Sequence, residues 1–496
     1  MRSGWSALFL SAALLAGCGS AMLNPVTGET ERSVMSEEDE LAEGAKAHAE
    51  VLQEYGVVAN PALQAYVTAL GAKLAAQSHR NQLQWHFTVL DSPEINAFAL
   101  PGGYVYITRG IMAYLDSEAD LAGVMGHEIG HVTARHGAQR ATRQQDAGLG
   151  VLAASVLGAV LESQGFGGAG RLAGDLSQTV AAGYIASYGR EQELQADSLG
   201  AEYLARVHYD PRNMVDVIRV LKAQEQYAAD AARAEGRTAP KGADWLASHP
   251  SNDQRLAAIS NLAAQYQGNK YADEGRARYQ KAIAGITFGD SVAQGLVRGR
   301  EFYHPALGFA LSAPPEWSFR NDATQLAVVN RAGDAAMVLR VVPPSAGSNP
   351  NAVLRTLFQP SQGRTEARRI NGLEATHFVG TRQTAQGSQR IEATVVSGPG
   401  DARYVLQYIA RDSAALQRAA AGLQAVESSF RALTTQDRAQ GREWRVQPQP
   451  YPRGGFAELA KTSPLPRAEQ QLRLLNGFYG GGEPPVGQLV KTVQLR

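Results

Sequence analysis

The spacing of the apolar residues changes near residue 285, and this change divides the chain. Before it, segments such as 36–56 and 60–78 carry apolar residues at helical spacing. After it, short β-type runs separated by turn residues follow one another through the segment 301–410. A chain of 496 residues is also too long for one ordinary core. The sequence therefore predicts more than one domain, and the first of them is mainly helical.

The first domain also contains signals for a small sheet and for a long helix. Segments 83–92 and 102–110 alternate in polarity and are rich in β-branched and aromatic residues, which predicts neighbouring strands. Ser117, with Asp120 three residues later, is a capping-box-like start of a long helix. We therefore predict an α+β protein with a mainly helical domain and a small β-sheet over 18–300, a small α+β domain over 301–434 and a short C-terminal module over 442–496.

The start of the chain has the layout of a secretory signal. Arg2 precedes an apolar run that is too short to span a bilayer and that ends at Cys18. Residues 15–18, Leu-Ala-Gly-Cys, resemble a bacterial lipoprotein signal, which implies removal of residues 1–17 and acylation of Cys18. Gly19 in place of an aspartate implies a lipid anchor in the outer membrane, facing the periplasm. The alternative is a chance cysteine in an ordinary cleaved signal.

The composition argues against a nucleic-acid partner and against disulfide bonds within the chain. Lys plus Arg and Asp plus Glu number 47 each, so no net charge attracts nucleic acid, and we expect no nucleic-acid partner. Cys18 is the only cysteine, which excludes a disulfide bond within the chain. Stability must therefore come from apolar cores and from any bound metal.

One further apolar segment leaves two interpretations open. Residues 148–161 are apolar on all sides but too few to cross a membrane. We expect a buried helix there. The alternative is a mobile flap or a membrane-facing element above the functional site.

Candidate metal ligands are concentrated in the stretch AGVMGHEIGHVTARH, residues 122–136, which contains three histidines. His127 and His131 are four residues apart and so share one face of the predicted helix, with Glu128 beside them. A catalytic zinc ion usually takes three protein ligands and one water, and a neighbouring carboxylate can accept the proton of that water. His136, five residues after His131, is off the two-ligand face, and we expect it to pack on the helix surface or to cap the helix.

The third ligand must come from another segment. Residues 190–197 offer Glu193 and, four residues later on the same helix face, Asp197. One carboxylate can bind the metal while the other accepts a hydrogen bond from a ligand histidine. From composition alone, a solvated helix face is the competing interpretation.

Four separated motifs then resemble one family. The segments NAFALPGG (96–103), HEIGHVTARH (127–136), REQELQAD (190–197) and HPSNDQR (249–255) are similar, in this order, to the zinc peptidase family that includes the CAAX prenyl endopeptidase, in its periplasmic lipoprotein branch. The resemblance covers about residues 18–310 and implies a zincin-type domain with one zinc ion per chain. It implies zinc ligands at His127, His131 and Glu193, a general base at Glu128, and Asp197 behind a ligand. The membrane-spanning members have helices that flank the site and this sequence has none, so CAAX processing is excluded.

The same resemblance suggests roles for two further segments. Asn96, Ala97, Phe98 and Ala99 resemble an edge strand that binds an extended peptide, whereas a plain core strand is the alternative. His249 resembles a loop histidine that approaches the zinc, either to stabilise the oxyanion together with Arg255 or to occupy the water position as a latch. Without the resemblance, His249 is a turn residue and Arg255 a surface charge.

The C-terminal segments give weaker signals. Residues 301–434 resemble accessory modules behind this peptidase in some bacterial lipoproteins. Residues 442–496 look weakly like a degenerate LysM module, which implies contact with peptidoglycan, whereas a stabilising cap is the alternative.

Together these patterns predict a lipid-anchored periplasmic zinc metalloendopeptidase. Its expected substrates are misfolded or stalled envelope proteins. The rival hypothesis is an assembly factor or chaperone for outer-membrane proteins, with a latent or structural zinc site.

Overall fold

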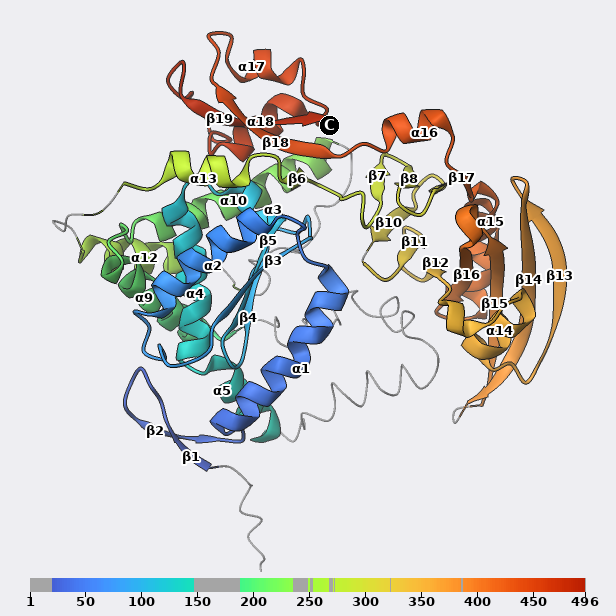
Figure 1. Ribbon diagram of the computed structural model, residues 1–496, viewed down its shortest axis with the longest axis horizontal. Helices are drawn as coiled ribbons and strands as arrows, with labels where there is room; N and C mark the ends of the chain where they lie inside the picture. The colour runs from blue at the N-terminus through green and yellow to red at the C-terminus, as the bar shows by residue number, and fades with distance from the viewer. Residues whose placement is uncertain are drawn as a thin grey trace, which may run out of the picture.

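The computed structural model describes residues 20–146, 188–234, 249, 253–266, 271, 273–321, 323–384 and 387–495. Its mixture of helices and small sheets confirms the α+β fold class (Figure 1). The predicted signal peptide with Cys18 and the apolar segment 148–161 lie outside the described residues. Within the described ranges, no helix is both long and apolar enough to cross a bilayer.

The first part of the chain is mainly helical, as predicted. Ser117 caps the N-terminus of α4 through a capping box with Asp120, and Asn60 caps α2. The helices are α1 (Glu37–Tyr55), α2 (Pro61–Ala75), α3 (Arg109–Tyr114), α4 (Glu118–Thr133), α5 (His136–Asp146), α9 (Arg190–Arg206), α10 (Asn213–Ala234), α12 (Asp253–Ala264) and α13 (Arg276–Ile283).

Two small sheets accompany these helices. The strands β1 (Ser20–Leu23) and β2 (Thr30–Ser33) form a hairpin. In the second sheet, β5 (Tyr104–Thr108) lies between β3 (His86–Leu90), which is parallel to it, and β4 (Ala97–Leu100), which is antiparallel. The two segments predicted as neighbouring strands are therefore paired as β3 and β5, and β4 is the edge strand next to α4.

A second, β-rich part follows and lies to the right in Figure 1. Its largest sheet has the order β10-β11-β12-β16-β15-β14-β13, and a smaller sheet has the order β17-β9-β8-β7. Of the three clusters of buried apolar side chains that include strands of the large sheet, one contains residues of α15 and another contains residues of α14. The strands are β7 (Leu296–Arg298), β8 (Glu301–His304), β9 (Phe309–Ser312), β10 (Ser318–Asn321), β11 (Leu326–Val329), β12 (Ala335–Val341), β13 (Gln362–Ile370), β14 (Leu373–Thr384), β15 (Gly387–Ser397), β16 (Arg403–Ala410) and β17 (Arg431–Ala432), with helices α14 (Pro350–Phe358), α15 (Ser413–Ser429) and α16 (Thr435–Gln440) and short 3-10 turns at Pro344–Ala346 and Pro399–Asp401.

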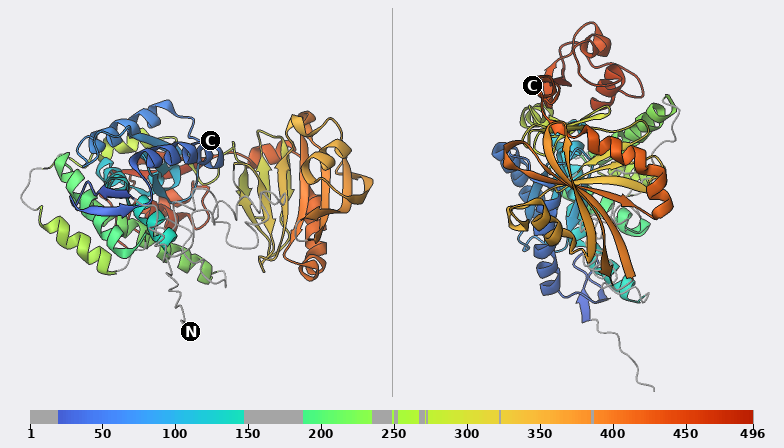
Figure 2. Two further views of the ribbon diagram at one scale, coloured as in Figure 1. Left: turned by 90° about the horizontal axis from the view of Figure 1, so that it is seen from below. Right: turned by 90° about the vertical axis from the view of Figure 1, so that its right-hand side faces the viewer.

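The chain then returns to the helical part. Its last segment contains β18 (Trp444–Pro450), α17 (Gly455–Ala460), α18 (Ala468–Leu475) and β19 (Leu489–Leu495), and β18 pairs with both β19 and β6 (Thr287–Phe288). Figures 1 and 2 show this segment against the helical part and apart from the β-rich part. Its apolar side chains belong to the same core as those of α3, α4 and α13. The predicted contact with peptidoglycan stays a prediction.

A buried cation joins this last segment to the start of α4. The side chain of Lys491 in β19 is fully buried, and its Nζ donates to the Leu115 carbonyl oxygen at 2.6 Å. The same Nζ lies 2.9 Å from Asp116 Oδ1. Burial lowers the pKa of Lys491, although the neighbouring Asp116 opposes this shift.

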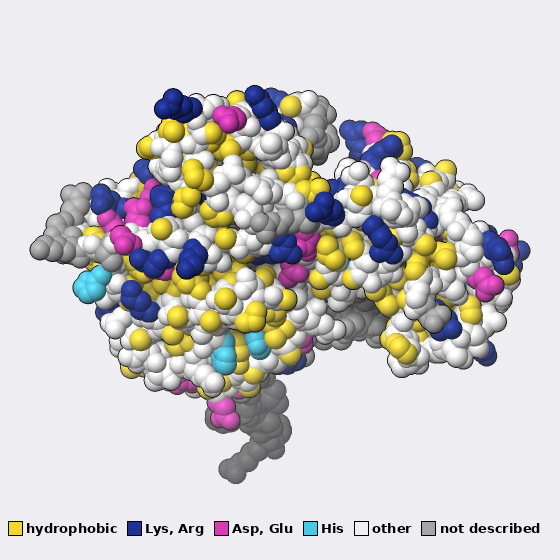
Figure 3. Space-filling model, turned by 45° about the horizontal axis from the view of Figure 1, so that its top comes forward, with side chains coloured by type: hydrophobic (Ala, Val, Ile, Leu, Met, Phe, Trp, Pro, Cys, Tyr) yellow, Lys and Arg dark blue, Asp and Glu magenta, His cyan; other side chains and the backbone are white. Residues whose placement is uncertain are grey.

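On the face shown in Figure 3, charged side chains do not gather into one large patch of a single sign. Basic and acidic side chains are scattered there among polar and apolar ones. This distribution agrees with the equal numbers of basic and acidic residues in the sequence.

We predict that Lys491→Met destabilises the helical part, because Asp116 would lose the cation that compensates it. Loss of one partner from a largely buried ion pair costs about 3 kcal/mol. For a domain of this size, that loss lowers the melting temperature by roughly 6–12 °C in calorimetry. Lys461→Met, at an exposed position, is the matched control. Equal melting temperatures for both variants would contradict the role assigned to Lys491.

Candidate metal centre

The candidate site lies where α4 and α9 pack closely together. A methyl group added at Gly130 in α4 would lie 3.0 Å from the carbonyl oxygen of Ala196 in α9. One added at Gly126 would lie 3.3 Å from the Cα atom of Gly200. The two small residues on each helix are four apart and thus form one contact stripe. Because each glycine of α4 directly precedes a histidine, this close contact places the histidines beside α9.

Four buried side chains meet at this contact. His127 and His131 come from α4, Glu193 comes from α9, and His249 precedes α12. Each offers one ligand atom, and the four atoms all lie within 4.8 Å of one another. His127 Nε2 is 3.0 Å from His131 Nε2 and 3.2 Å from His249 Nδ1. Glu193 Oε1 is 3.1 Å from His249 Nδ1 and 3.4 Å from His131 Nε2.

These distances and the donor set fit a zinc ion. Zinc bonds of 2.0–2.2 Å in a tetrahedral shell separate neighbouring ligand atoms by about 3.4 Å. Imidazole nitrogens together with one carboxylate oxygen are also ligands that zinc takes. The predicted ligands His127, His131 and Glu193 are thus brought together. His249 adds a third nitrogen as the fourth ligand atom, which the sequence alone left open.

Asp197 orients His127 from behind. Asp197 Oδ1 lies 2.8 Å from His127 Nδ1, on the opposite side of the ring from the cluster. Arg255 in α12 donates to both oxygens of Asp197, from Nε at 2.6 Å and from Nη2 at 2.7 Å. A carboxylate behind a ligand histidine fixes the ring and its tautomer. The geometry therefore agrees with the role that the resemblance implied for Asp197.

The guanidinium of Arg255 contacts other groups of the protein on several sides. Besides Asp197, its Nη1 donates to the His249 carbonyl oxygen at 3.0 Å and lies 2.8 Å from Glu193 Oε2. The side chain is buried, so it is not the surface charge of the simpler interpretation. These contacts favour a role in holding Asp197, Glu193 and the His249 segment, and the oxyanion role of Arg255 stays a prediction.

The charges in the cluster leave a negative excess. Burial raises the pKa of Glu193, but His249 and His131 outweigh this effect and hold it well below its ordinary value. Burial likewise raises the pKa of Asp197, and Arg255 outweighs it so that the pKa is lowered. Burial holds the pKa of His131 well below its ordinary value, which keeps this ring neutral and able to bind a metal. The two ionised carboxylates face one guanidinium and exceed it by one negative charge, so burial of a cation beside them would be favoured.

Glu128 and His249 face each other across the cluster. His249 Nε2 lies 3.5 Å from Glu128 Oε1, and both side chains are buried. Burial lowers the pKa of His249, but Glu193 and Glu128 raise it above its ordinary value. Glu128 therefore lies beside the His249 ring, next to the group of candidate ligand residues, as expected of a general base.

His136 is placed differently from the prediction. It begins α5 and is fully buried, rather than packing on the helix surface. The reason is that α4 ends at Thr133 and Arg135 adopts a left-handed conformation with φ 58°, which turns His136 back toward His131. Its Nδ1 lies 2.8 Å from His131 Nδ1. Burial lowers the pKa of His136 to about 4, so this ring is neutral.

The sequence analysis did not identify Tyr188. Its ring stacks on the ring of His131 with a centroid distance of 3.9 Å and an interplanar angle of 20°. Burial raises the pKa of Tyr188, and Glu128 adds to this rise. Its place two residues before α9 was the only local signal, and a tyrosine at such a position is too common to be assigned a role.

The predicted substrate strand is an edge strand, as expected. Residues 97–100 form β4, and Asn96 pairs with Thr108 beside it, since the Asn96 N–H donates to Thr108 Oγ1 at 3.1 Å. Asn96 and all four residues of β4 are buried. A substrate role for Asn96, Ala97, Phe98 and Ala99 stays a prediction.

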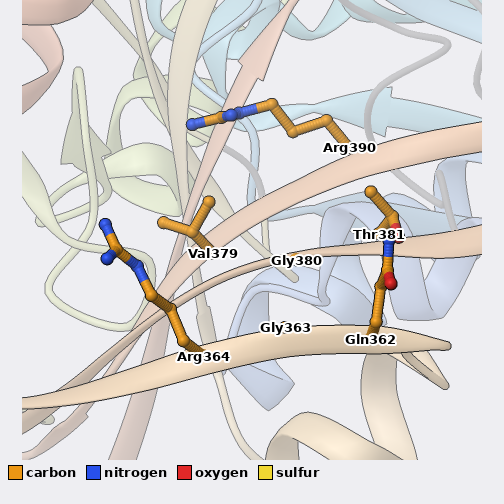
Figure 4. A pocket seen from close by; sticks show the side chains of 7 residues that line it. All are labelled: Gln362, Gly363, Arg364, Val379, Gly380, Thr381 and Arg390. Carbon is orange, nitrogen blue, oxygen red and sulfur yellow. The ribbon is translucent and has the colours of Figure 1, made fainter.

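A shallow hollow on the surface lies away from the buried cluster of candidate ligands. It lies in the β-rich part, on strands β13, β14 and β15, with Arg364 and Arg390 at its rim (Figure 4). The side chains that line it include no histidine, cysteine or carboxylate. The buried cluster is therefore the stronger candidate site, because it combines ligand atoms with a candidate base.

We predict that Glu193→Ala loses zinc, since the variant removes the carboxylate oxygen that lies beside His131 and His249 and would bind the cation. Mature wild-type protein should retain about one zinc per chain after dialysis, measured by elemental analysis. Glu191→Ala, at an exposed position two residues earlier, should match the wild type. Undiminished zinc in Glu193→Ala would rule out this ligand.

Comparisons with known proteins agree with the site. Residues 61–263 match the model of Peptidase family M48. The beta-barrel assembly-enhancing protease of Yersinia pestis is 31% identical over 268 residues, which cover 52% of this chain and 52% of that protein. The protein of the same name from Escherichia coli (strain K12) is 32% identical over 212 residues, which cover 42% of this chain and 40% of that protein.

A mitochondrial metalloendopeptidase is also similar to part of this chain. The mitochondrial metalloendopeptidase OMA1 of Arabidopsis thaliana is 32% identical over 192 residues, which cover 38% of this chain and 33% of that protein. The chain thus spans about half, or less, of the length of the curated relatives it matches. The region matched by the family model contains the whole buried cluster. Residues 61–263 of this chain are thus similar to Peptidase family M48.

Proposed function

We propose that this chain is a zinc metalloendopeptidase of the bacterial envelope that cleaves misfolded or stalled envelope proteins. The observation that carries the proposal is the buried group of His127, His131, Glu193 and His249, with Glu128 beside it. The names of the relatives from Yersinia pestis and Escherichia coli, which are proteases that enhance β-barrel assembly, support the choice of envelope substrates.

The residues around the cluster provide the parts of a peptide hydrolysis. A bound zinc ion would supply Lewis-acid chemistry, which polarises a carbonyl group and acidifies water. Glu128 accepts the proton of the attacking water and then gives it to the leaving amine. An extended substrate chain adds to the edge of β4 that pairs with no described strand, next to α4.

The proposed location follows from the start of the sequence. The apolar run before Cys18 resembles a lipoprotein signal, and this supports an acyl anchor that holds the protein in the outer membrane, facing the periplasm. The hairpin of β1 and β2 begins two residues after Cys18.

A second candidate function is an assembly factor or chaperone for outer-membrane proteins, with a latent zinc site. One observation favours it, namely that His249 Nδ1 lies among the ligand atoms, where it would complete four protein ligands. A catalytic zinc needs an open position, so this arrangement describes a resting state. The two candidates differ in whether the site ever opens to substrate.

The test of the proposed function is Glu128→Gln. We predict that cleavage of an unfolded protein such as casein falls about 10²- to 10⁴-fold, as expected for loss of a general base, with zinc content unchanged. Unchanged cleavage would contradict the proposed function. If wild type and variant are both inactive on all unfolded proteins but both support outer-membrane protein assembly, the second candidate is favoured.

We further predict that His249→Ala raises proteolysis, including self-cleavage, while one zinc is retained. The physical reason is that removal of this ring opens the fourth position, and His127, His131 and Glu193 remain as ligands. Steady-state cleavage and zinc content are measured on both proteins. A fall of about 10- to 1,000-fold would instead indicate support of the oxyanion, and equal rates would exclude both roles.

For the anchor, we predict that Cys18→Ser leaves an unprocessed or soluble periplasmic form. The acyl chains would be missing, and the variant should move out of the outer-membrane fraction. Fractionation followed by immunoblotting measures this change. A variant that remains in the outer membrane in the same amount would exclude acylation as the anchor.

A further inference from the structure

His136 and Gln195 form a chain of neutral hydrogen bonds behind His131. The Nδ1 atom of His131 lies 2.8 Å from Nδ1 of His136, and Nε2 of His136 lies 2.9 Å from Oε1 of Gln195 in α9. His136 is fully buried. The arrangement parallels the one behind His127, where Asp197 takes the place of His136 and Arg255 the place of Gln195.

The direction of these bonds follows from donor and acceptor chemistry. The amide oxygen of Gln195 only accepts, so Nε2 of His136 must carry the proton and donate it. A neutral imidazole has one N–H, so Nδ1 of His136 accepts and Nδ1 of His131 donates. His131 then has no proton on Nε2. That atom is the one that lies 3.0 Å from His127 Nε2, inside the cluster.

A second contact fixes the plane of the same ring. Tyr188 stacks on His131 at a centroid distance of 3.9 Å. The hydrogen bond from His131 Nδ1 to His136 fixes the direction in which the His131 nitrogens point. The stacked Tyr188 ring limits tilting of the His131 ring out of its plane. The Nε2 lone pair of His131 is therefore aimed into the cluster before any ligand binds, which lowers the entropy lost on binding.

We propose that His136 is a positioning residue for the metal centre and that, with Gln195, it selects the tautomer of His131 that can bind zinc. The inference rests on the proposed function, since it concerns the same metal site. It also explains a difference between the two ligand histidines of α4: His127 is oriented by a charged pair, and His131 by two neutral groups.

The first test compares substitutions at His136 that keep or remove the acceptor. His136→Leu should weaken zinc binding about 10- to 100-fold, the usual effect of losing such a partner. His136→Asn, whose amide oxygen can accept from His131, should recover most of the loss. Zinc affinity is measured by competition with a chromogenic chelator, and the spectrum of the cobalt-substituted protein should shift in His136→Leu and return in His136→Asn.

The second test uses Gln195. The two possible directions of the hydrogen bond between Gln195 and His136 predict opposite results for one of its variants. Gln195→Glu keeps an acceptor for His136 Nε2, so zinc affinity should equal or exceed that of the wild type. Gln195→Leu removes the acceptor and should weaken zinc binding. If Gln195 instead donated to His136, Gln195→Glu would weaken binding at least as much as Gln195→Leu, and the proposed tautomer would be wrong.

Melting temperatures of the zinc-free proteins separate positioning from general stability. All four variants should melt within a few degrees of the wild type without zinc, yet differ in zinc affinity. Equal zinc affinities across the series would overturn the role of His136 while leaving the metal site intact. A wild-type protein that binds no zinc would instead contradict the proposed function itself, so the two failures can be told apart.

Discussion

The close contact between α4 and α9 is the constraint on which the site depends. Gly126 and Gly130 on one helix face Ala196 and Gly200 on the other, and added methyl groups would lie within 3.3 Å of backbone atoms across the contact. Interaxial distances range over about 8–10 Å with the size of the side chains at the contact. Larger residues here would therefore move Glu193 away from the nitrogens of His127 and His131. The small residues thus determine which side chains can share one ion.

The contact also places negatively charged side chains in the interior, and a neighbouring arginine pairs with them. Glu193 and Asp197 are both buried, and burial alone would favour their neutral forms. Arg255 contacts both and also holds the His249 carbonyl oxygen, so one guanidinium connects the two carboxylates to the segment that precedes α12. An unpaired buried charge costs several kcal/mol, which explains why the cluster favours binding of a divalent cation.

The sequence predicted those parts of the site that depend on local spacing. The capping box at Ser117 and the four-residue interval from His127 to His131 follow from helix geometry alone. Glu193 and Asp197 share a helix face by the same rule, but only the resemblance to a family singled them out from other acids. The α+β class likewise followed from the change in apolar periodicity near residue 285.

The remaining features depend on contacts that spacing does not encode. His136 turns back because Arg135 breaks the helix, whereas a continuous helix would have carried it away from His131. His249 meets His127 across 122 residues, and Lys491 meets Leu115 across 376 residues. Pairings over such distances arise from tertiary packing and leave no periodic signal in the sequence.

The most direct measurement of the central claim is X-ray absorption at the zinc edge on the purified wild-type protein. The account predicts a first shell of four light atoms at about 2.0–2.1 Å, with scattering from three imidazole rings and one carboxylate. Two imidazole rings would place His249 outside the shell in solution. A shell with one or no imidazole ring would contradict the assignment of His127, His131 and Glu193 as the site that holds the metal.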